Sequence, residues 1–301
     1  MNITNPVFDE LVGLGVLNPD TVRLCHPKTR DRAIPVLMDE TSGIIFLQAA
    51  ETSDEYYEME KAQDREGEQT ITALADGDSV RAAALPDDRR HFEMFRNLTA
   101  GARICDFGCG YGGFLSLNRG HAAERCGVEL RRHCQTHLRL TDSGVDVAPA
   151  IGDFERAFDV VTLFHVLEHI PHQVTVLSEI RDTLAPRGKI VVEVPHARDF
   201  LIQSVDLPAF RDFTFWSEHL VLHTEASVAA VLEAAGYGQI EIMRHQRYGF
   251  TNHLGWFLDG MPGGHERYAH FERSGFQAAY GDYLAELNAT DTLIAVAESN
   301  P

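Results

Sequence analysis

The sequence predicts an α/β fold, a doubly wound and mostly parallel sheet with helices on both faces. Two observations predict it. From Asp87 onward, apolar runs of strand length alternate with helical stretches, and repeated strand–helix units build a parallel sheet. In the run ICDFGCGYGGF at 104–114, a strand then ends in an acid and glycines crowd the following turn, as a loop pressed against a ligand requires.

The expected elements follow one another in a regular order. The strands are expected at 102–107, 123–130, within 145–154, at 157–166, 187–196, 239–246 and 291–299. The helices are expected at 87–98, from about 113, at 131–140, at 172–186 with Pro186 as its stop, and at 225–235 before Gly236. If the last two strands pair, the sheet closes with an antiparallel edge.

Three parts of the chain differ in character. Residues 1–86 form an N-terminal extension with a hairpin (33–39 and 43–48) and a polar helical stretch near 54–69, and we expect this part to act as a lid or substrate region. Residues 87–250 with 289–301 form the nucleotide-binding domain. Residues 251–288 are a late insertion whose aromatic side chains and glycines suit either an acceptor-facing loop or a contact in a homo-oligomer.

Composition excludes several classes of partner. The net charge is −19, from 26 basic and 45 acidic residues, and so acidic a surface repels the phosphate backbone of nucleic acid. No apolar run has the length of a membrane span, and the N-terminus lacks the basic region of a signal peptide. The five cysteines contain no C-x-x-C pair and do not form a disulfide framework. We therefore expect a cytoplasmic protein without a membrane or nucleic-acid partner.

The glycine loop leaves two kinds of nucleotide open. Gly108, Gly110 and Gly113 match the G-x-G-x-x-G spacing of dinucleotide-binding proteins, and Glu129 ends the second strand, where an acid binds ribose hydroxyls. A nicotinamide-dependent dehydrogenase is therefore one candidate. Asp106 argues against it, because a carboxylate at the end of the first strand repels a pyrophosphate and suits an amine.

Six motifs in register over about residues 87–245 resemble the class I S-adenosylmethionine-dependent methyltransferases. They are DFGCGYGG, the acid in GVEL, the GDF element at 152–154, FDVVTLFHVLEHIPH, LAPRGKIVVEVPH and HTEASVAAVLEAAGY. The resemblance implies a Rossmann-like, seven-stranded sheet and S-adenosyl-L-methionine as the cofactor. The cofactor-binding residues in the glycine loop would be Asp106, Gly108, Cys109, Gly110 and Gly112.

The resemblance also assigns roles to residues at the ends of the other strands. Glu129 would bind the ribose hydroxyls, and Asp153 with Phe154 would surround the adenine, although Phe154 also suits the core. His165 would line the cofactor pocket at the end of the fourth strand. The segment SDEYYEME resembles a tyrosine-rich segment over the cofactor and makes Tyr57 a lid residue, with aromatic packing as the alternative.

The string WSEHL at 216–220 resembles the Glu-His element of sugar methyltransferases. It implies His219 as the catalytic base and Glu218 as its orienting partner, while a purely structural role of both is the alternative. Sugar C-methyltransferases carry an N-terminal, cysteine-rich zinc segment, and this chain has only Cys25 in that region. O-methylation of a sugar or polysaccharide precursor therefore fits better than C-methylation, and a sugar C-methyltransferase or a natural-product methyltransferase is the alternative.

The motif H165-V-L-E168-H169 matches a zinc peptidase pattern literally. That chemistry needs both histidines on one helix face and a third ligand. Here His165 ends an apolar strand and Pro171 follows His169 closely, so we expect no metal site. The sequence thus predicts a methyltransferase whose acceptor is a small molecule of the carbohydrate class. The rival interpretations are the dehydrogenase and a non-catalytic nucleotide-binding module.

Overall fold

The computed structural model describes residues 2–51 and 85–300. The chain divides into two compact units, each described by itself. The first unit comprises Met1–Glu51, His165–Val176 and Val192–Ala297, and the second comprises the described part of Thr52–Phe164, Leu177–Val191 and Glu298–Pro301. Tyr57 and the helix predicted near 54–69 lie outside the described residues. The division of the chain predicted from the sequence stays a prediction.

The seven-stranded sheet confirms the predicted fold class. Its strand order is β10-β11-β8-β7-β4-β5-β6. The central pairs β4–β5, β4–β7 and β5–β6 are parallel, as the strand–helix alternation predicts. In chain order the strands are β4 (Arg103–Phe107), β5 (Glu124–Val128), β6 (Val145–Ala148), β7 (Phe158–Phe164), β8 (Leu184–Pro195), β10 (Tyr237–His245) and β11 (Thr292–Ser299).

The edge of the sheet closes with an antiparallel strand. The N–H of His196, just after β8, donates to the carbonyl of Asp291, just before β11. At the opposite end, Arg187 near the start of β8 pairs with Glu298 near the end of β11 at 2.9 Å. Strands β8 and β11 therefore run in opposite directions.

Helices join these strands where the sequence predicts them. They are α4 (Pro86–Thr99), α5 (Gly113–Leu117), α6 (Arg132–Thr141), α7 (Gln173–Asp182) and α9 (Glu225–Ala234). The predicted end of α7 was wrong, because the helix ends at Asp182 and Pro186 belongs to β8. Proline restricts the residue before it to extended backbone, so Ala185 cannot continue the helix.

A second, four-stranded antiparallel sheet lies in the first unit. Its order is β1-β2-β3-β9, with β1 (Val22–His26), β2 (Val36–Asp39), β3 (Ile45–Leu47) and β9 (Val221–Leu222). The β2–β3 hairpin confirms the prediction for this region. Helix α1 (Pro6–Gly13) precedes the sheet, and the Asn5 side chain before it donates to Leu47 O at 2.9 Å and to Leu220 O at 2.8 Å. Asn5 thereby links the N-terminal segment to the end of β3 and to the residue that precedes β9.

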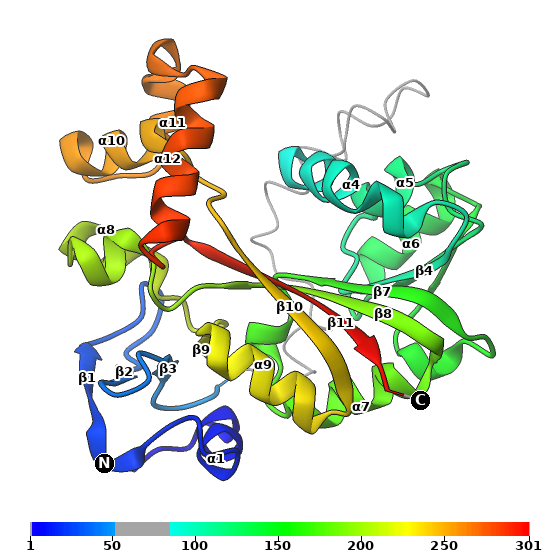
Figure 1. Ribbon diagram of the computed structural model, residues 1–301, viewed down its shortest axis with the longest axis horizontal. Coiled ribbons are helices and arrows are strands. Elements are labelled where there is room, and N and C mark those ends of the chain that lie inside the picture. The colour runs from blue at the N-terminus through cyan, green and yellow to red at the C-terminus, as the bar shows by residue number, and fades with distance from the viewer. Residues whose placement is uncertain (1, 52–84, 301) are drawn as a thin grey trace. The chain divides into compact units, whose positions relative to one another are not determined.

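The segment between β10 and β11 is helical. It contains α10 (Phe250–Asp259), α11 (Gly264–Arg267) and α12 (Ser274–Glu286), drawn in orange and red in Figure 1. Trp256 of α10 is buried against Phe210 and Phe213 of α8 (Pro208–Thr214), with ring centroids 5.0 and 5.2 Å apart. Its indole is therefore part of the packing and is not available to an acceptor, whereas Phe257 is 45% exposed.

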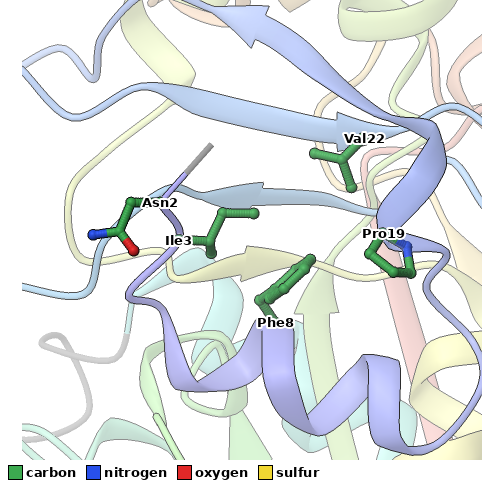
Figure 2. A pocket seen from close by; sticks show the side chains of 5 residues that line it. All are labelled: Asn2, Ile3, Phe8, Pro19 and Val22. Atoms are coloured by element: carbon green, nitrogen blue, oxygen red, sulfur yellow. The ribbon is translucent and has the colours of Figure 1, made fainter.

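The described residues contain no membrane-spanning helix, and a hollow in the first unit is lined by none of the predicted site residues. None of the helices within residues 2–51 and 85–300 has the length and apolar character of a membrane span. A half-open hollow of about 380 Å³ in the first unit is lined by Asn2, Ile3, Phe8, Pro19 and Val22 (Figure 2). None of these residues belongs to the predicted site, and only one carries a polar side chain.

Candidate active site

The glycine loop after β4 needs glycine for its backbone conformation. Gly108, Gly110 and Gly112 have φ values of 79°, 53° and 75°, in the left-handed region that side chains disfavour. The N–H groups of Gly108 and Cys109 both donate to Val128 O, at 2.8 and 3.0 Å. The loop is thus held against the end of β5, and α5 begins immediately after it.

Asp106 is buried at the end of β4, as the sequence predicts. Its Oδ1 accepts a 2.7 Å hydrogen bond from the Thr162 hydroxyl. Burial raises the pKa of Asp106 to about 7, and the charges of Asp88 and Glu129 raise it further, while the bond from Thr162 opposes the shift. A positively charged ligand near this carboxylate would favour its ionised form.

A third carboxylate at the loop was not predicted. Asp88 of α4 lies against the start of α5, where a Cβ placed on Gly113 would clash with its carboxylate oxygens. Burial raises the pKa of Asp88, and the N–H of Leu85 donates to it at 2.8 Å. Negative charge therefore occupies the place at which a dinucleotide-binding loop would hold a pyrophosphate.

Glu129 lies at the end of β5 and is fixed by its own chain. Gly110 N–H donates to its Oε2 at 2.9 Å, and the backbone N–H of Arg131 donates to its Oε1 at 2.9 Å. The Arg131 guanidinium adds two contacts of 3.1 Å to the same carboxylate. A ribose that binds Glu129 would have to share it with Arg131, a residue that the sequence analysis did not identify.

Asp153 and Phe154 follow β6, and both take part in local structure. Asp153 is exposed and accepts from Ala150 N–H at 3.1 Å, which closes the short helix η2 (Ile151–Asp153). Phe154 is buried, and its ring meets Phe158 edge-on with centroids 5.7 Å apart. The packing of Phe154 agrees with the core alternative stated for it.

His165 is the first residue after β7 and belongs to the first unit, whereas the residues described so far belong to the second. Its φ of 55° is unusual for a residue with a side chain, and strain of this kind clusters at functional sites. The ring places Nε2 at 2.8 Å from Glu193 and Nδ1 at 3.4 Å from Glu168. Burial lowers the pKa of His165, but the two carboxylates outweigh it and raise the value to about 9.

Glu193 was missed in the sequence, although a signal was present. It is the one acid in the apolar run IVVEVP of β8, and its side chain is fully buried. A buried acid in such a strand needs a partner, and His165 is that partner here. The role of His165 as a cofactor-pocket residue stays a prediction.

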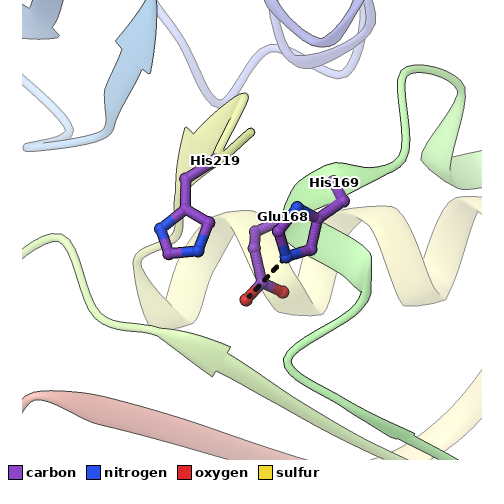
Figure 3. Close-up of side chains that lie close together, drawn as sticks. All are labelled: Glu168, His169 and His219. Carbon is purple, nitrogen blue, oxygen red and sulfur yellow. Dashed lines mark ion pairs between the residues drawn. The ribbon is translucent and has the colours of Figure 1, made fainter. Parts of the chain in front are cut away.

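Glu168, His169 and His219 form a cluster in the first unit (Figure 3). One side-chain ligand atom of each lies within 4.8 Å of the others. Glu168 and His169 belong to the short helix η3 (Leu167–His169), and His169 Nε2 lies 3.9 Å from Glu168 Oε1. The imidazole rings of His169 and His219 meet edge-on, with centroids 5.0 Å apart.

The surroundings of His219 decide the charge of its imidazole. Burial lowers the pKa of His219 to about 3, the charge of His169 lowers it further, and Glu168 opposes the shift, so the imidazole is neutral at neutral pH. Glu218 is buried at 6% exposure. The structure brings the carboxylate of Glu168 close to His219. In the sequence, Glu168 is noted only as part of the zinc-peptidase pattern.

The family of the chain follows from comparison with known proteins. The family model described as a methyltransferase domain matches residues 80–242, more than half of the chain, so the protein belongs to this family. Ubiquinone biosynthesis O-methyltransferase of Xanthomonas euvesicatoria pv. vesicatoria is 32% identical over 126 residues, which cover 38% of this chain and 52% of the relative. The same-named protein of Ralstonia nicotianae is 31% identical over 110 residues, 32% of this chain and 44% of the relative.

The chain therefore spans about half the length of the curated relatives that it matches. Among solved structures, a SAM-dependent methyltransferase from Archaeoglobus fulgidus is 15% identical, with a TM-score of 0.49 over 79% of this chain and 100% of the other. A putative sarcosine dimethylglycine methyltransferase from Galdieria sulphuraria is 14% identical, with a TM-score of 0.49 over 79% and 98%.

Membership of this family makes the chain an enzyme of the methyltransferase class, with S-adenosylmethionine as its cofactor. The residues of the second unit fit that cofactor. The sulfonium and amino groups carry positive charge, and Asp88 and Asp106 supply negative charge beside a glycine loop without bulky side chains. A dinucleotide would instead bring a pyrophosphate to the same carboxylates.

Proposed function

We propose that the protein transfers a methyl group from S-adenosylmethionine to a hydroxyl group of a small-molecule acceptor. The observation that carries the proposal is the cluster of carboxylates at the glycine loop, since Asp88, Asp106 and Glu129 suit a cationic adenosyl ligand. The family match supports methyl transfer, and the names of the curated relatives support oxygen as the atom that is methylated.

For the cofactor we propose the roles that the sequence implies. Asp106 binds the methionyl amine, and the backbone of Gly108, Cys109, Gly110 and Gly112 leaves room for the ligand to approach closely. Glu129 binds the ribose hydroxyls together with Arg131. Asp153 and Phe154 are proposed for the adenine, with the buried ring of Phe154 as one wall. When bound, the cofactor supplies a methyl group on a sulfonium sulfur.

For the acceptor we propose the segment that carries His219. A neutral imidazole can accept a proton from a hydroxyl or bind it through a lone pair. The sequence implies Glu218 as the orienting partner, and the carboxylate of Glu168, which lies in one cluster with His219, is a second candidate for that role. The step that this chain must perform is to hold the acceptor oxygen and remove its proton.

The chemical class of the acceptor has two candidates. The WSEHL element favours a hydroxyl of a sugar or polysaccharide precursor. The curated relatives are named for ubiquinone biosynthesis and lend that carbohydrate class no support. We therefore propose a small-molecule hydroxyl as the acceptor and let a screen of both classes decide between them. A homo-oligomer and a cytoplasmic location stay predictions.

Calorimetric titration with S-adenosylmethionine, S-adenosylhomocysteine and NAD tests the cofactor. We expect micromolar binding of the two adenosyl compounds and a loss of that binding in Glu129→Ala. Binding of NAD alone would favour the dehydrogenase. An acceptor panel of glycan and quinone precursors, read as formation of S-adenosylhomocysteine, then tests methyl transfer, and a protein that binds the cofactor without any turnover would point to a non-catalytic module.

A further inference from the structure

Glu168 is a buried carboxylate whose charged neighbours in the described part of the chain are imidazoles. Its side chain is fully buried, and neither carboxylate oxygen accepts a hydrogen bond from any residue within 2–51 and 85–300. The nearest cations are imidazoles, with His165 Nδ1 at 3.4 Å and His169 Nε2 at 3.9 Å, which are ion-pair contacts. These imidazoles stabilise the negative charge of the carboxylate, and its oxygens keep lone pairs that can bind an ion.

Two nitrogen donors face the same place. Figure 3 shows the imidazoles of His169 and His219 on either side of the Glu168 carboxylate. The three ligand atoms lie within 4.8 Å of one another. A tetrahedral ion with bonds of about 2.0–2.2 Å holds its ligand atoms about 3.4 Å apart, so side-chain movements of about 1 Å would complete the geometry.

The backbone holds the two ligand-bearing segments together. Leu220 N–H donates to Glu168 O at 2.8 Å, directly beside His219. Leu220 O in turn accepts from Leu47 N–H and from the Asn5 side chain, so the segment is fixed on both sides. Ligands on a supported backbone can bind an ion without a large loss of conformational entropy.

We propose that Glu168, His169 and His219 bind a divalent transition-metal ion such as Zn²⁺. Two imidazoles and one carboxylate form the ligand set of catalytic zinc sites, in which a further position stays open for water or substrate. Nitrogen ligands disfavour Mg²⁺ and Ca²⁺, which prefer oxygen. The ion would bind lone pairs of the Glu168 carboxylate that accept no well-aligned hydrogen bond within residues 2–51 and 85–300.

The expectation of no metal site from the sequence rests only on the zinc-peptidase geometry. That geometry requires His165 and His169 on one long helix, and the structure instead pairs His165 with Glu193 at 2.8 Å. The third ligand comes from His219, which is distant in the sequence and was assigned to catalysis. The ligand set E168-H169 with His219 is therefore not the zinc-peptidase pattern.

The role of the ion rests on the proposed function. As a ligand, His219 uses on the ion the lone pair that would otherwise take the proton. An acceptor hydroxyl in the open position therefore loses its proton to water, because a bound cation stabilises the resulting alkoxide. The alkoxide oxygen forms a bond to the methyl carbon, the carbon–sulfur bond breaks, and its electron pair stays on sulfur. The sulfonium thereby becomes a neutral thioether, and one proton is released per turnover.

Metal binding is tested directly with Co²⁺, whose visible d–d absorption reports nitrogen and oxygen ligation, and with Zn²⁺ by calorimetry. The full-length protein is first treated with a chelator. We expect one ion per chain, a Tm that rises with Zn²⁺, and binding at least tenfold weaker in Glu168→Gln and in His219→Ala. The matched control is His172→Ala, since His172 is exposed and outside the cluster, and it should bind as tightly as the parent protein.

The outcomes separate the metal site from the proposed function. Absence of Co²⁺ and Zn²⁺ binding in the folded parent protein, or equal binding by His219→Ala and the parent, overturns the site. Binding of Mg²⁺ alone overturns the assignment to a transition metal. Metal binding without methyl transfer would support the site and count against the proposed function, whereas methyl transfer that survives the chelator would support the function and overturn the role of the ion. If Glu168→Gln unfolds, His169→Ala gives the same comparison.

Discussion

The backbone N–H of Leu220 donates a 2.8 Å hydrogen bond to the carbonyl oxygen of Glu168. This bond joins the short helix after β7 to the segment that enters β9. It explains why His219, which the sequence places far from Glu168, lies beside the Glu168 carboxylate. The candidate acceptor site thus depends on a long-range backbone contact and on the small sheet that supports it.

Asp106→Asn should weaken the binding of S-adenosylmethionine by about 10- to 100-fold, because a hydrogen bond to a charged group contributes about 1.5–3 kcal/mol. Asparagine keeps an oxygen for the hydrogen bond from Thr162, so the fold should persist. Calorimetry measures the affinity. Asp146→Asn, an exposed acid of β6, is the control, and equal affinity in all three proteins would remove Asp106 from the proposed cofactor site.

Gly112→Ala should lower the free energy of unfolding by about 2–4 kcal/mol. Its φ of 75° disfavours a side chain, and a Cβ there would clash with the buried side chain of Leu138. Gly120→Ala is the matched control, since its φ is 71° but nothing lies within 4 Å of the new Cβ. Urea unfolding of both variants isolates the clash, and equal losses would show that Leu138 moves aside without cost.

Asp199→Asn should reduce the pH dependence of stability. Burial, with the nearby charge of Asp291, raises the pKa of Asp199 to about 8, above the unfolded value of about 3.9. The folded protein therefore binds this proton more tightly, and the free energy of unfolding falls as the pH rises from about 4 to about 8. Over this pH range the free energy of unfolding of the asparagine variant should fall less than that of the parent protein, by on the order of 1 kcal/mol or more.

Unfolding in urea between pH 5 and pH 8.5 measures this difference. Asparagine can still accept the backbone hydrogen bonds from Leu201 and Ile202, so the variant should fold. Asp282→Asn, an exposed acid of α12, should leave the pH profile unchanged. Parallel profiles for Asp199→Asn and the parent protein would show that Asp199 is ionised in the folded state at neutral pH.

Asn5→Ala should destabilise the protein by about 2–4 kcal/mol, because it removes an N-cap and two buried hydrogen bonds. Methyl transfer should fall by more than the unfolded fraction accounts for, since Leu220 loses one of its supports. Asn2→Ala, at an exposed position, is the control. A fall in stability with full specific activity of the folded fraction would show that the site does not depend on this support.

The parts of the fold that could be predicted depend on local sequence pattern. The strand–helix alternation from β4 to β8 and the β2–β3 hairpin follow from periodicity and turn residues. The end of α7 was placed too late, because the proline itself was taken as the stop although its restriction acts on the residue before it.

The candidate site could be predicted only in part. The places of Asp106 and Glu129 at strand ends could be predicted because parallel strands bring their carboxyl ends to one edge of a sheet, while their roles in binding stay predictions. Arg131 and Asp88 were missed, since nothing in their local sequence indicates which carboxylate or helix end they meet. The approach of His219 to Glu168 needs a contact between distant segments, which no local pattern encodes.

The hydrogen bonds of Asn5 have a consequence for chimeric proteins. Residues before α1 are often exchanged, shortened or fused to tags as though they were neutral. Here such a change would reach the backbone beside His219 through a single amide side chain. A chimera that takes its N-terminal segment from another methyltransferase would therefore keep this support only where that segment also supplies an amide side chain at the position of Asn5.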